Sequence, residues 1–269
     1  MTRNGTGRQL WECLICDYQS SCIVGTVFEH SKLPLPVWFL AMYLMTKFKN
    51  AINALTLKRQ LGVSYKTAWL LKHKLLQTML LREAPSRLDV RVEIDDAYLG
   101  GERAGMHPWR AGACKQIGLC RRRANQRVRQ IALHAPDAHR RFYQSSDQGW
   151  AATHLMPTAH VVCDGLQCLK PVSSLAATHQ RYVTGGGRQA PQTPQLRWVN
   201  TVPGNLKTAL AGTYHSFDHA KYGARYPAEF AYHFNRRFDL PAMVPGLLWA
   251  AAAIKPQPLK ILRWSEAGK

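Results

Sequence analysis

Hydrophobic positions between residues 33 and 82 recur at helical spacing. One apolar run predicts a helix that begins at Pro34 and Pro36. Leu57 and Leu61 lie on one face of a second helix, which Gly62 ends. A third helix is placed by Ser64 as its N-cap and by the apolar positions Val63, Ala68, Trp69, Leu71, Leu75 and Met79.

Two helices joined by a glycine turn, with basic residues on the second helix, are typical of a helix-turn-helix. The pattern predicts such a region over residues 33–84, entering the DNA major groove with the start of its second helix. An ordinary helical hairpin with a solvated basic face is the alternative. The predicted DNA contacts are Ser64, Tyr65, Lys66, Thr67, Lys72 and Lys74, and His73 is expected to be exposed beside them.

Two later stretches predict short strands that each end in an aspartate. "VEI" precedes Asp95 and Asp96, and "AHVVC" precedes Asp164. Because adjacent strand residues point to opposite faces, Asp96 is expected to point away from Asp95. Near the C-terminus a helix is predicted, with aromatic residues every four positions and with Glu229 and Arg236 on a different face.

Residues 106–155 show no clean alternation of apolar and polar positions. They are rich in Arg, Ala, Gln and His and poor in β-branched residues. This composition predicts a basic loop or a helix, without paired strands. Residues 181–217, with a glycine triplet and several prolines, are predicted to be rich in loops.

The net charge of the chain is its strongest indication of a binding partner. The 269 residues carry 36 Lys and Arg against 16 Asp and Glu, a formal net charge of +20. Such a field attracts polyanions, and double-stranded DNA is the first candidate partner. The N-terminus shows no signal peptide, and the longest apolar run is too short to span a bilayer. We therefore expect a cytoplasmic protein with no membrane partner.

Seven cysteines in a chain without an export signal argue against disulfides. Cys13 and Cys16 form one CxxC knuckle within residues 1–32. A structural zinc site normally needs four ligands, which the knuckle alone does not supply. Cys22 and His30 are the nearby candidates to complete such a site.

Three acidic residues stand out in this basic chain: Asp95, Asp164 and Glu229. Converging carboxylates repel one another unless a cation neutralises them. Hard divalent cations such as Mg²⁺ bind oxygen ligands and support phosphoryl transfer. The alternative is that each acid is only a turn, capping or surface residue.

Several motifs together resemble a bacterial insertion-sequence transposase of the DDE group, the ISXO type with a zinc ribbon and a helix-turn-helix. They cover residues 10–105 and 158–250. In chain order, the segments that carry the resemblance are "CLICDYQSSCIVGTVFEHSKLPLPVWFLAMYL", "LKRQLGVSYKTAWLLKHKL", "VEIDDAYLGGE", "VVCDGL", "VNTVPGNLKTALAGTYHSF" and "YPAEFAYHFNRRFD".

The resemblance implies a mixed α/β (α+β) protein: a helical N-terminal DNA-binding region, then an RNase H-like catalytic domain over residues 90–250 and a tail over 251–269. It implies cutting and joining of DNA at element ends with Mg²⁺ or Mn²⁺, by a homo-oligomer associated with the bacterial nucleoid. Asp95, Asp164 and Glu229 match the catalytic and metal-binding acids, with Asn235 as the fallback third residue. Arg236 matches a basic family position, and Lys207 and His215 are implied DNA or supporting contacts.

Two departures from the family pattern shape the expectations. The first zinc knuckle is missing, and residues 106–155 do not resemble the family where two core strands of the sheet are expected. One hypothesis is that frameshifts removed these strands and left a decayed, inactive transposase. A DNA-binding protein or repressor that has lost catalysis is therefore the alternative function. An RNA-binding protein is a third reading, but the chain lacks the aromatic sheet motif of such modules.

Overall fold

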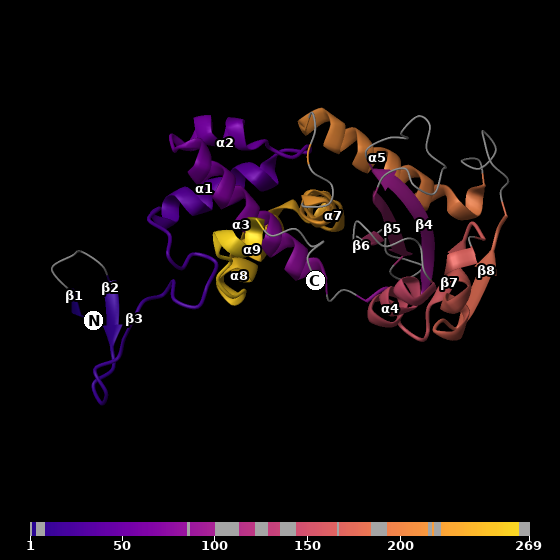
Figure 1. Cartoon of the computed structure of the whole chain (residues 1–269), viewed down its shortest axis with the longest axis horizontal. Helices are drawn as coiled ribbons and strands as arrows, with labels where there is room; N and C mark the ends of the chain where they lie inside the picture. Colours follow the sequence, from indigo (N-terminus) through magenta and orange to yellow (C-terminus); the bar gives the residue numbers. More distant parts are fainter. Residues whose placement is uncertain are drawn as a thin grey trace.

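A computed structural model describes the backbone of residues 2–3, 9–84, 87–99, 113–121, 129–134, 144–165, 167–183, 193–214, 217 and 222–263. Side chains in this part are described except at residues 2, 3, 9, 95–99, 113–121, 129–134, 144–147 and 168. His215 lies outside the described residues. Helices and strands are mixed along the chain, as expected for the α+β class, and Figure 1 shows a helical part beside a sheet.

One five-stranded sheet has the order β6-β5-β4-β7-β8. Strand β4 pairs antiparallel with β5, which pairs antiparallel with β6. On its other side β4 pairs parallel with β7, and β7 pairs parallel with β8. The strands are β4 Arg91–Leu99, β5 Ala113–Arg121, β6 Arg129–His134, β7 His160–Cys163 and β8 Thr178–Arg181.

The prediction that residues 106–155 form no paired strands is wrong. Both β5 and β6 lie in this stretch, and α4 (Gln144–His154) follows them. The register pairs Ile117 with Leu133 and Leu119 with Ile131. Each strand thus has only two alternating apolar positions among arginines and glutamines, too weak a local signal without the partner strand. The hypothesis of two lost core strands loses its motivation.

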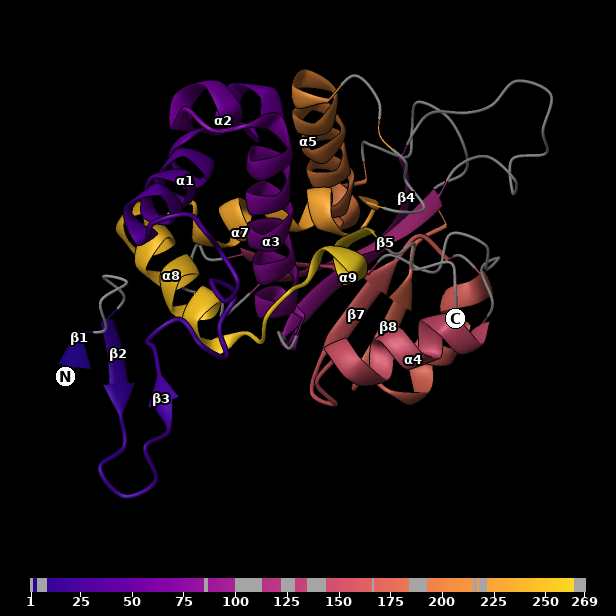
Figure 2. The ribbon, with the colours of Figure 1, turned by 60° about the vertical axis from the view of Figure 1, so that its left-hand side comes forward.

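The two faces of the sheet bury different partners (Figures 1 and 2). Val92 and Ile94 of β4 share a core with Trp150 and Ala151 of α4. Glu93 lies between them in sequence, and its carboxylate instead meets the start of α5 (Arg197–Thr213). Because side chains alternate along a strand, α4 and α5 cover opposite faces.

Helix α5 corrects the prediction that residues 181–217 are mainly loop. Its buried residues Val199, Val202, Leu206 and Leu210 form one apolar face. Pro203 lies inside the helix, where proline removes a backbone hydrogen bond. Burial of the apolar face outweighs the cost of the hydrogen bond lost at Pro203. The prediction of a loop gave too much weight to the prolines and glycines of this stretch.

The three N-terminal helices follow the predicted boundaries. They are α1 (Leu35–Lys47), α2 (Ala54–Leu61) and α3 (Tyr65–Glu83). Gly62 ends α2 in the left-handed conformation at φ 65°. The Ser64 hydroxyl accepts a 3.2 Å hydrogen bond from the Thr67 amide, which confirms Ser64 as the N-cap of α3.

The C-terminal helices pack against these N-terminal ones rather than extending away. They are α7 (Arg225–Arg236), α8 (Met243–Ala253) and α9 (Leu259–Arg263). Helix α3 contacts all three, and α8 also contacts α1. Apolar side chains of α7 and α8 join those of the N-terminal helices, of α5 and of Val162 on β7 in one large core. Short 3₁₀ turns lie at Gln167–Ser174, Pro194–Leu196 and Leu240–Ala242.

The N-terminal segment projects from the helical part in Figures 1 and 2. It contains β1 (Thr2–Arg3), β2 (Gln9–Glu12) and β3 (Gln19–Ser20), paired antiparallel in that order. Across the described ranges, no helix combines the length and the apolar character that crossing a membrane requires.

Candidate active site and nucleic-acid interface

Asp95 and Asp164 each directly follow the last residue that is paired between two neighbouring parallel strands. The last register pair between β4 and β7 joins Ile94 to Cys163, and the next residues along the two strands are these aspartates. Neighbouring strands lie about 4.8 Å apart, so the two backbones run side by side at this point. The side chain of Asp95 lies outside the described residues, whereas that of Asp164 is half-buried.

Asp95 does not lie at a strand end, contrary to the prediction. Strand β4 continues to Leu99 because β5 pairs with it over its whole length. Only the parallel partner β7 stops, at Cys163, where Gly165 then turns the chain at φ 92°. The two aspartates therefore follow paired residues at the place where β7 ends beside the middle of β4.

Glu93 is a positioning residue that the sequence analysis missed. One carboxylate oxygen accepts hydrogen bonds from the amides of Trp198 and Val199, at 3.1 and 3.2 Å. The other oxygen lies 3.6 Å from the Arg91 guanidinium. A carboxylate at the start of α5 satisfies free amides and complements the helix dipole. The available signal was an acid within the apolar strand, two positions before Asp95.

Glu229 lies in a closed cluster between α7, α3 and the end of α5. Its side chain is only 1% exposed. The Tyr214 hydroxyl donates to Glu229 Oε2 at 3.2 Å, and Lys72 Nζ donates in turn to the Tyr214 oxygen. Lys72 also donates to the Ile52 carbonyl. Tyr214, which the sequence analysis did not single out, thus bridges two buried charges.

Burial shifts the titration of this cluster. Desolvation lowers the pKa of Lys72 to about 8, and the nearby Glu229 carboxylate offsets part of that effect. Desolvation raises the pKa of Glu229, opposed by Lys72 and by the Tyr214 hydrogen bond. Burial and the Glu229 charge also raise the pKa of Tyr214. Tyr214 therefore stays a neutral donor between the two groups.

Asn235 and Arg236 both contact the C-terminal end of α3. The Asn235 amide donates to Glu83 Oε2 at 2.5 Å, and Arg236 lies 2.7 Å from Glu83 Oε1. The Arg236 guanidinium also lies 3.9 Å from the centre of the Tyr232 ring. These contacts with Glu83 tie α7 to α3.

A divalent cation is only partly accommodated by these residues. Two carboxylates on neighbouring strands are suitable oxygen ligands for Mg²⁺ or Mn²⁺. Glu229 is instead held by Tyr214 near Lys72, although its Oε1 atom is buried without a hydrogen-bond partner among the described residues. Within the described side chains, which exclude Asp95, no three His, Cys, Asp or Glu residues group as metal ligands.

The start of α3 presents the predicted DNA contacts, but its middle does not. Ser64, Tyr65 and Lys66 are exposed and Thr67 is half-buried. The prediction that Lys72, His73 and Lys74 are on display is wrong, because all three are buried. Helices α1, α2, α7, α8 and α9 surround α3, so little of this helix faces solvent.

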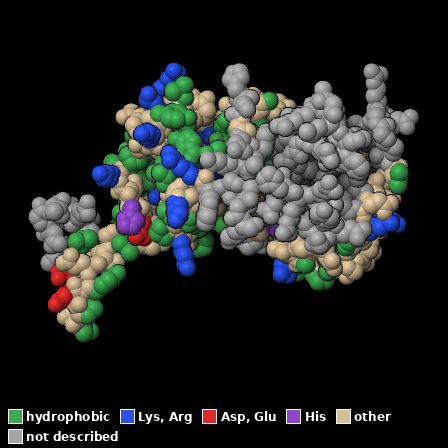
Figure 3. Space-filling model, viewed as in Figure 1, with side chains coloured by type: hydrophobic (Ala, Val, Ile, Leu, Met, Phe, Trp, Pro, Cys, Tyr) green, Lys and Arg blue, Asp and Glu red, His purple; other side chains and the backbone are tan. Residues whose placement is uncertain are grey.

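The basic surface extends beyond α3. Lys207 is exposed on α5, as a DNA contact requires. On the face seen in Figure 3, Lys and Arg side chains are spread over the helical part. The acidic side chains in view lie on the projecting N-terminal segment and beside the histidine where this segment meets the helical part. Exposed cations without neighbouring acids favour contact with phosphates.

The CxxC knuckle lies between β2 and β3. Cys13 and Cys16 are free and exposed. Backbone amides of Ile15 and Cys16 lower the pKa of the Cys13 thiol, which favours the thiolate that binds zinc. Among the described residues, neither Cys22 nor His30 joins the pair in a ligand group. The zinc site remains a prediction for which this part of the chain supplies two ligands.

The chain belongs to a family of transposases. Residues 87–235, more than half of the chain, match the ISXO2-like transposase domain family. The matched range contains the sheet, α5 and most of α7. This membership confirms the resemblance found from the motifs.

A curated relative is an uncharacterized protein in transposable element ISH50 of Halobacterium salinarum. It is 36% identical over 92 residues, which cover 34% of this chain and 30% of that protein. The chain therefore matches less than a third of the length of this relative.

Proposed function

We propose that this protein is a DNA transposase that cuts insertion-sequence ends and joins them to target DNA by metal-dependent phosphoryl transfer. The observation that carries the proposal is the register between β4 and β7, which sets Asp95 and Asp164 side by side in a domain of the transposase family. Turn or capping roles alone do not account for two acids adjacent in space and 69 positions apart in sequence.

An RNase H-like fold is part of this proposal. In chain order the strands lie 3-2-1-4-5, with the second antiparallel to the first and the fourth and fifth parallel to it. This arrangement supports such a fold, with helices on both faces of the sheet. The proposed catalytic edge is the place where the short fourth strand ends against the long first strand.

Asp95 and Asp164 would hold Mg²⁺ or Mn²⁺, which stabilises negative charge developing on phosphate oxygens. Glu93 positions the first strand by capping α5, so the backbone at Asp95 is fixed from one face. The exposed Lys66 and Lys207 would hold DNA phosphates, and the helix-turn-helix of α2 and α3 would place the duplex. We further propose that the protein acts as a homo-oligomer on DNA and is associated with the nucleoid.

Glu229 remains the candidate third acid, with Asn235 as the fallback. In the described arrangement the Glu229 carboxylate is held through Tyr214 by Lys72, a group on a DNA-binding helix. Use of Glu229 at the catalytic edge would require this cluster to open. Arg236, bound to Glu83, would act as a support for α7.

The closed Glu229 cluster also favours a second candidate function, a DNA-binding protein that no longer catalyses. The test is a nicking and strand-transfer assay on DNA carrying the flanking repeats of the element, with Mg²⁺ or Mn²⁺. Asp95→Asn should abolish cleavage and leave repeat binding intact, whereas Asp239→Asn, an exposed matched control, should leave both cleavage and binding unchanged. Repeat binding without cleavage by the unaltered protein would support the second candidate.

A further inference from the structure

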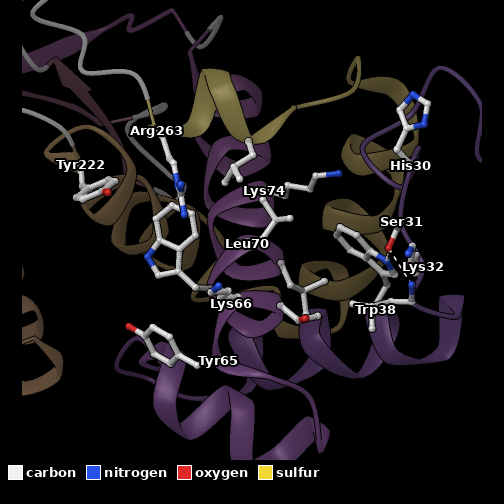
Figure 4. Close-up of a pocket in the computed structure, with 15 residues that line it drawn as sticks. His30, Ser31, Lys32, Trp38, Tyr65, Lys66, Leu70, Lys74, Tyr222 and Arg263 are labelled. Carbon is white, nitrogen blue, oxygen red and sulfur yellow. Dashed lines mark hydrogen bonds between the residues drawn. The ribbon is translucent and has the colours of Figure 1, made fainter.

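A cleft of about 650 Å³ runs along α3 in the helical part, away from the two aspartates. Its floor is the first half of α3, and its sides include Ser31, Lys32, Tyr222 and Arg263. Figure 4 shows Tyr65, Tyr222 and Arg263 toward one end, with His30 and Lys32 at the other. The volume lies in the range of pockets that hold a small ligand.

The floor of the cleft presents two rows of side chains from α3. Lys66, Leu70 and Lys74 are spaced by four residues and form one row, while Tyr65 and Trp69 form the next. The His73 ring lies 4.1 Å from the Trp69 ring and supports it from the buried side. Tyr65 is 51% exposed, so part of its side chain is accessible from the cleft.

The charge of the cleft is one-sided. Lys32, Lys66 and Arg263 contribute exposed cations, and no Asp or Glu occurs among its described lining residues. Lys74 donates to the Val27 and Glu29 carbonyls at 3.0 and 3.4 Å, so it is held in the wall of the cleft and adds positive potential there. Trp38 is buried, and its indole donates to the Ser31 hydroxyl, so it forms wall rather than stacking surface.

Binding to a duplex backbone requires cations, but the bases of a duplex are stacked on one another and do not offer their faces to aromatic rings in a cleft. Aromatic faces beside a basic track are instead the arrangement that holds single-stranded nucleic acid, because every base offers a face for stacking. We propose that this cleft binds one or two unstacked nucleotides of a DNA strand, with a base against Tyr65 or Trp69 and phosphates at Lys66 and Arg263. This inference rests on the proposed function, since it supplies a site for a strand separated from a duplex at α3.

The test compares binding of the full chain to a labelled single strand and to the matched duplex, both with the repeat sequence, by fluorescence anisotropy. Tyr65→Ala should weaken single-strand binding about tenfold, as loss of one stacking contact does. Tyr65→Phe, which keeps the ring, should bind as the unaltered protein does. Tyr43→Ala, at an exposed tyrosine on α1 outside the cleft, is the matched control and should also leave binding unchanged.

A base-stacking signal gives a second readout. A 2-aminopurine base in the single strand should lose fluorescence on binding to the unaltered protein and retain it with Tyr65→Ala. Equal weakening of single-strand and duplex binding by Tyr65→Ala would overturn the inference, since Tyr65 would then be a duplex contact. No effect on either would overturn it as well.

Failure of the inference and failure of the proposed function give different results. If cleavage depends on Asp95 but Tyr65→Ala has no selective effect on single-strand binding, nucleotide binding in the cleft is refuted and the proposed transposase function still holds. Selective single-strand binding through Tyr65 in a protein that never cleaves would support the cleft and refute the catalytic proposal.

Discussion

The helical part and the sheet differ in where they keep their charges. In the described residues, the buried cations Lys72, Lys74 and Arg225 and the buried acid Glu229 all lie on α3 and α7. Among the side chains of the sheet that the structure describes, Glu93 is buried, and Asp164 lies half-buried just after the end of β7. Charges in the helical part thus hold helices together, whereas those of the sheet edge remain candidates for chemistry.

This difference shows that a basic residue on a predicted DNA-binding helix is not necessarily a DNA contact. Lys72 and Lys74 bind backbone carbonyls of other segments, and Arg225 donates to Gln77 and to the Leu262 carbonyl. Buried polar groups of this kind are costly to leave unpaired. Changes in the two regions should therefore affect different observables.

The largest expected effect is on activity at the sheet edge. Asp164→Asn removes a charge from the proposed metal site and should lower strand cleavage by more than about 100-fold, beyond the loss typical of residues that only support ligands. The free energy of unfolding should change little, because the side chain is half-buried at a strand end. Cleavage assays and urea unfolding measure both. If stability falls together with activity, Asp164 supports the fold, as the buried Glu229 does, and the loss of cleavage does not show a metal ligand.

A large stability effect is expected in the helical part. Lys72→Met leaves Glu229 buried without its cation and should lower the free energy of unfolding by about 3–5 kcal/mol. The double variant Lys72→Met with Glu229→Gln should recover much of this loss. Lys58→Met, at an exposed lysine on α2, should change stability by less than about 0.5 kcal/mol. If the change in the free energy of unfolding of the double variant equals the sum of the changes in the single variants, the two charges do not interact.

The pH dependence of stability should report the same cluster. The folded pKa of Lys72 is about 8, against an ordinary value of 10.5. Between these values the unfolded chain binds more protons, so this lysine makes the free energy of unfolding rise with pH. The difference between the unaltered protein and Lys72→Met, followed by urea unfolding from pH 7 to 11, should show that rise. A flat difference would mean that Lys72 titrates as an exposed lysine does.

The smallest effect concerns the join between the two regions. Glu93→Ala removes the acceptor for two amides at the start of α5 and should lower the free energy of unfolding by about 1–2 kcal/mol, as loss of a helix cap does. Glu93→Gln keeps an oxygen acceptor and should cost less. If both variants are as stable as the unaltered protein, the first turn of α5 does not depend on this carboxylate.

Local signals predicted much of the helical part. The boundaries of α1 to α3, the left-handed Gly62 and the Ser64 cap all depend on residues within a few positions of one another. In contrast, β5, β6 and α5 were missed, because pairing and burial outweighed weak alternation and an internal proline.

By itself, the sequence determined the basic character of this protein, its family motifs and the local start and end of its N-terminal helices. Only the tertiary structure decided which charges are buried and which acids become neighbours. Lys72 meets Tyr214 across 142 positions, and Asp95 and Asp164 become adjacent only through the pairing of β4 with β7. Burial and register depend on distant partners, whereas propensities and caps act within one turn of chain.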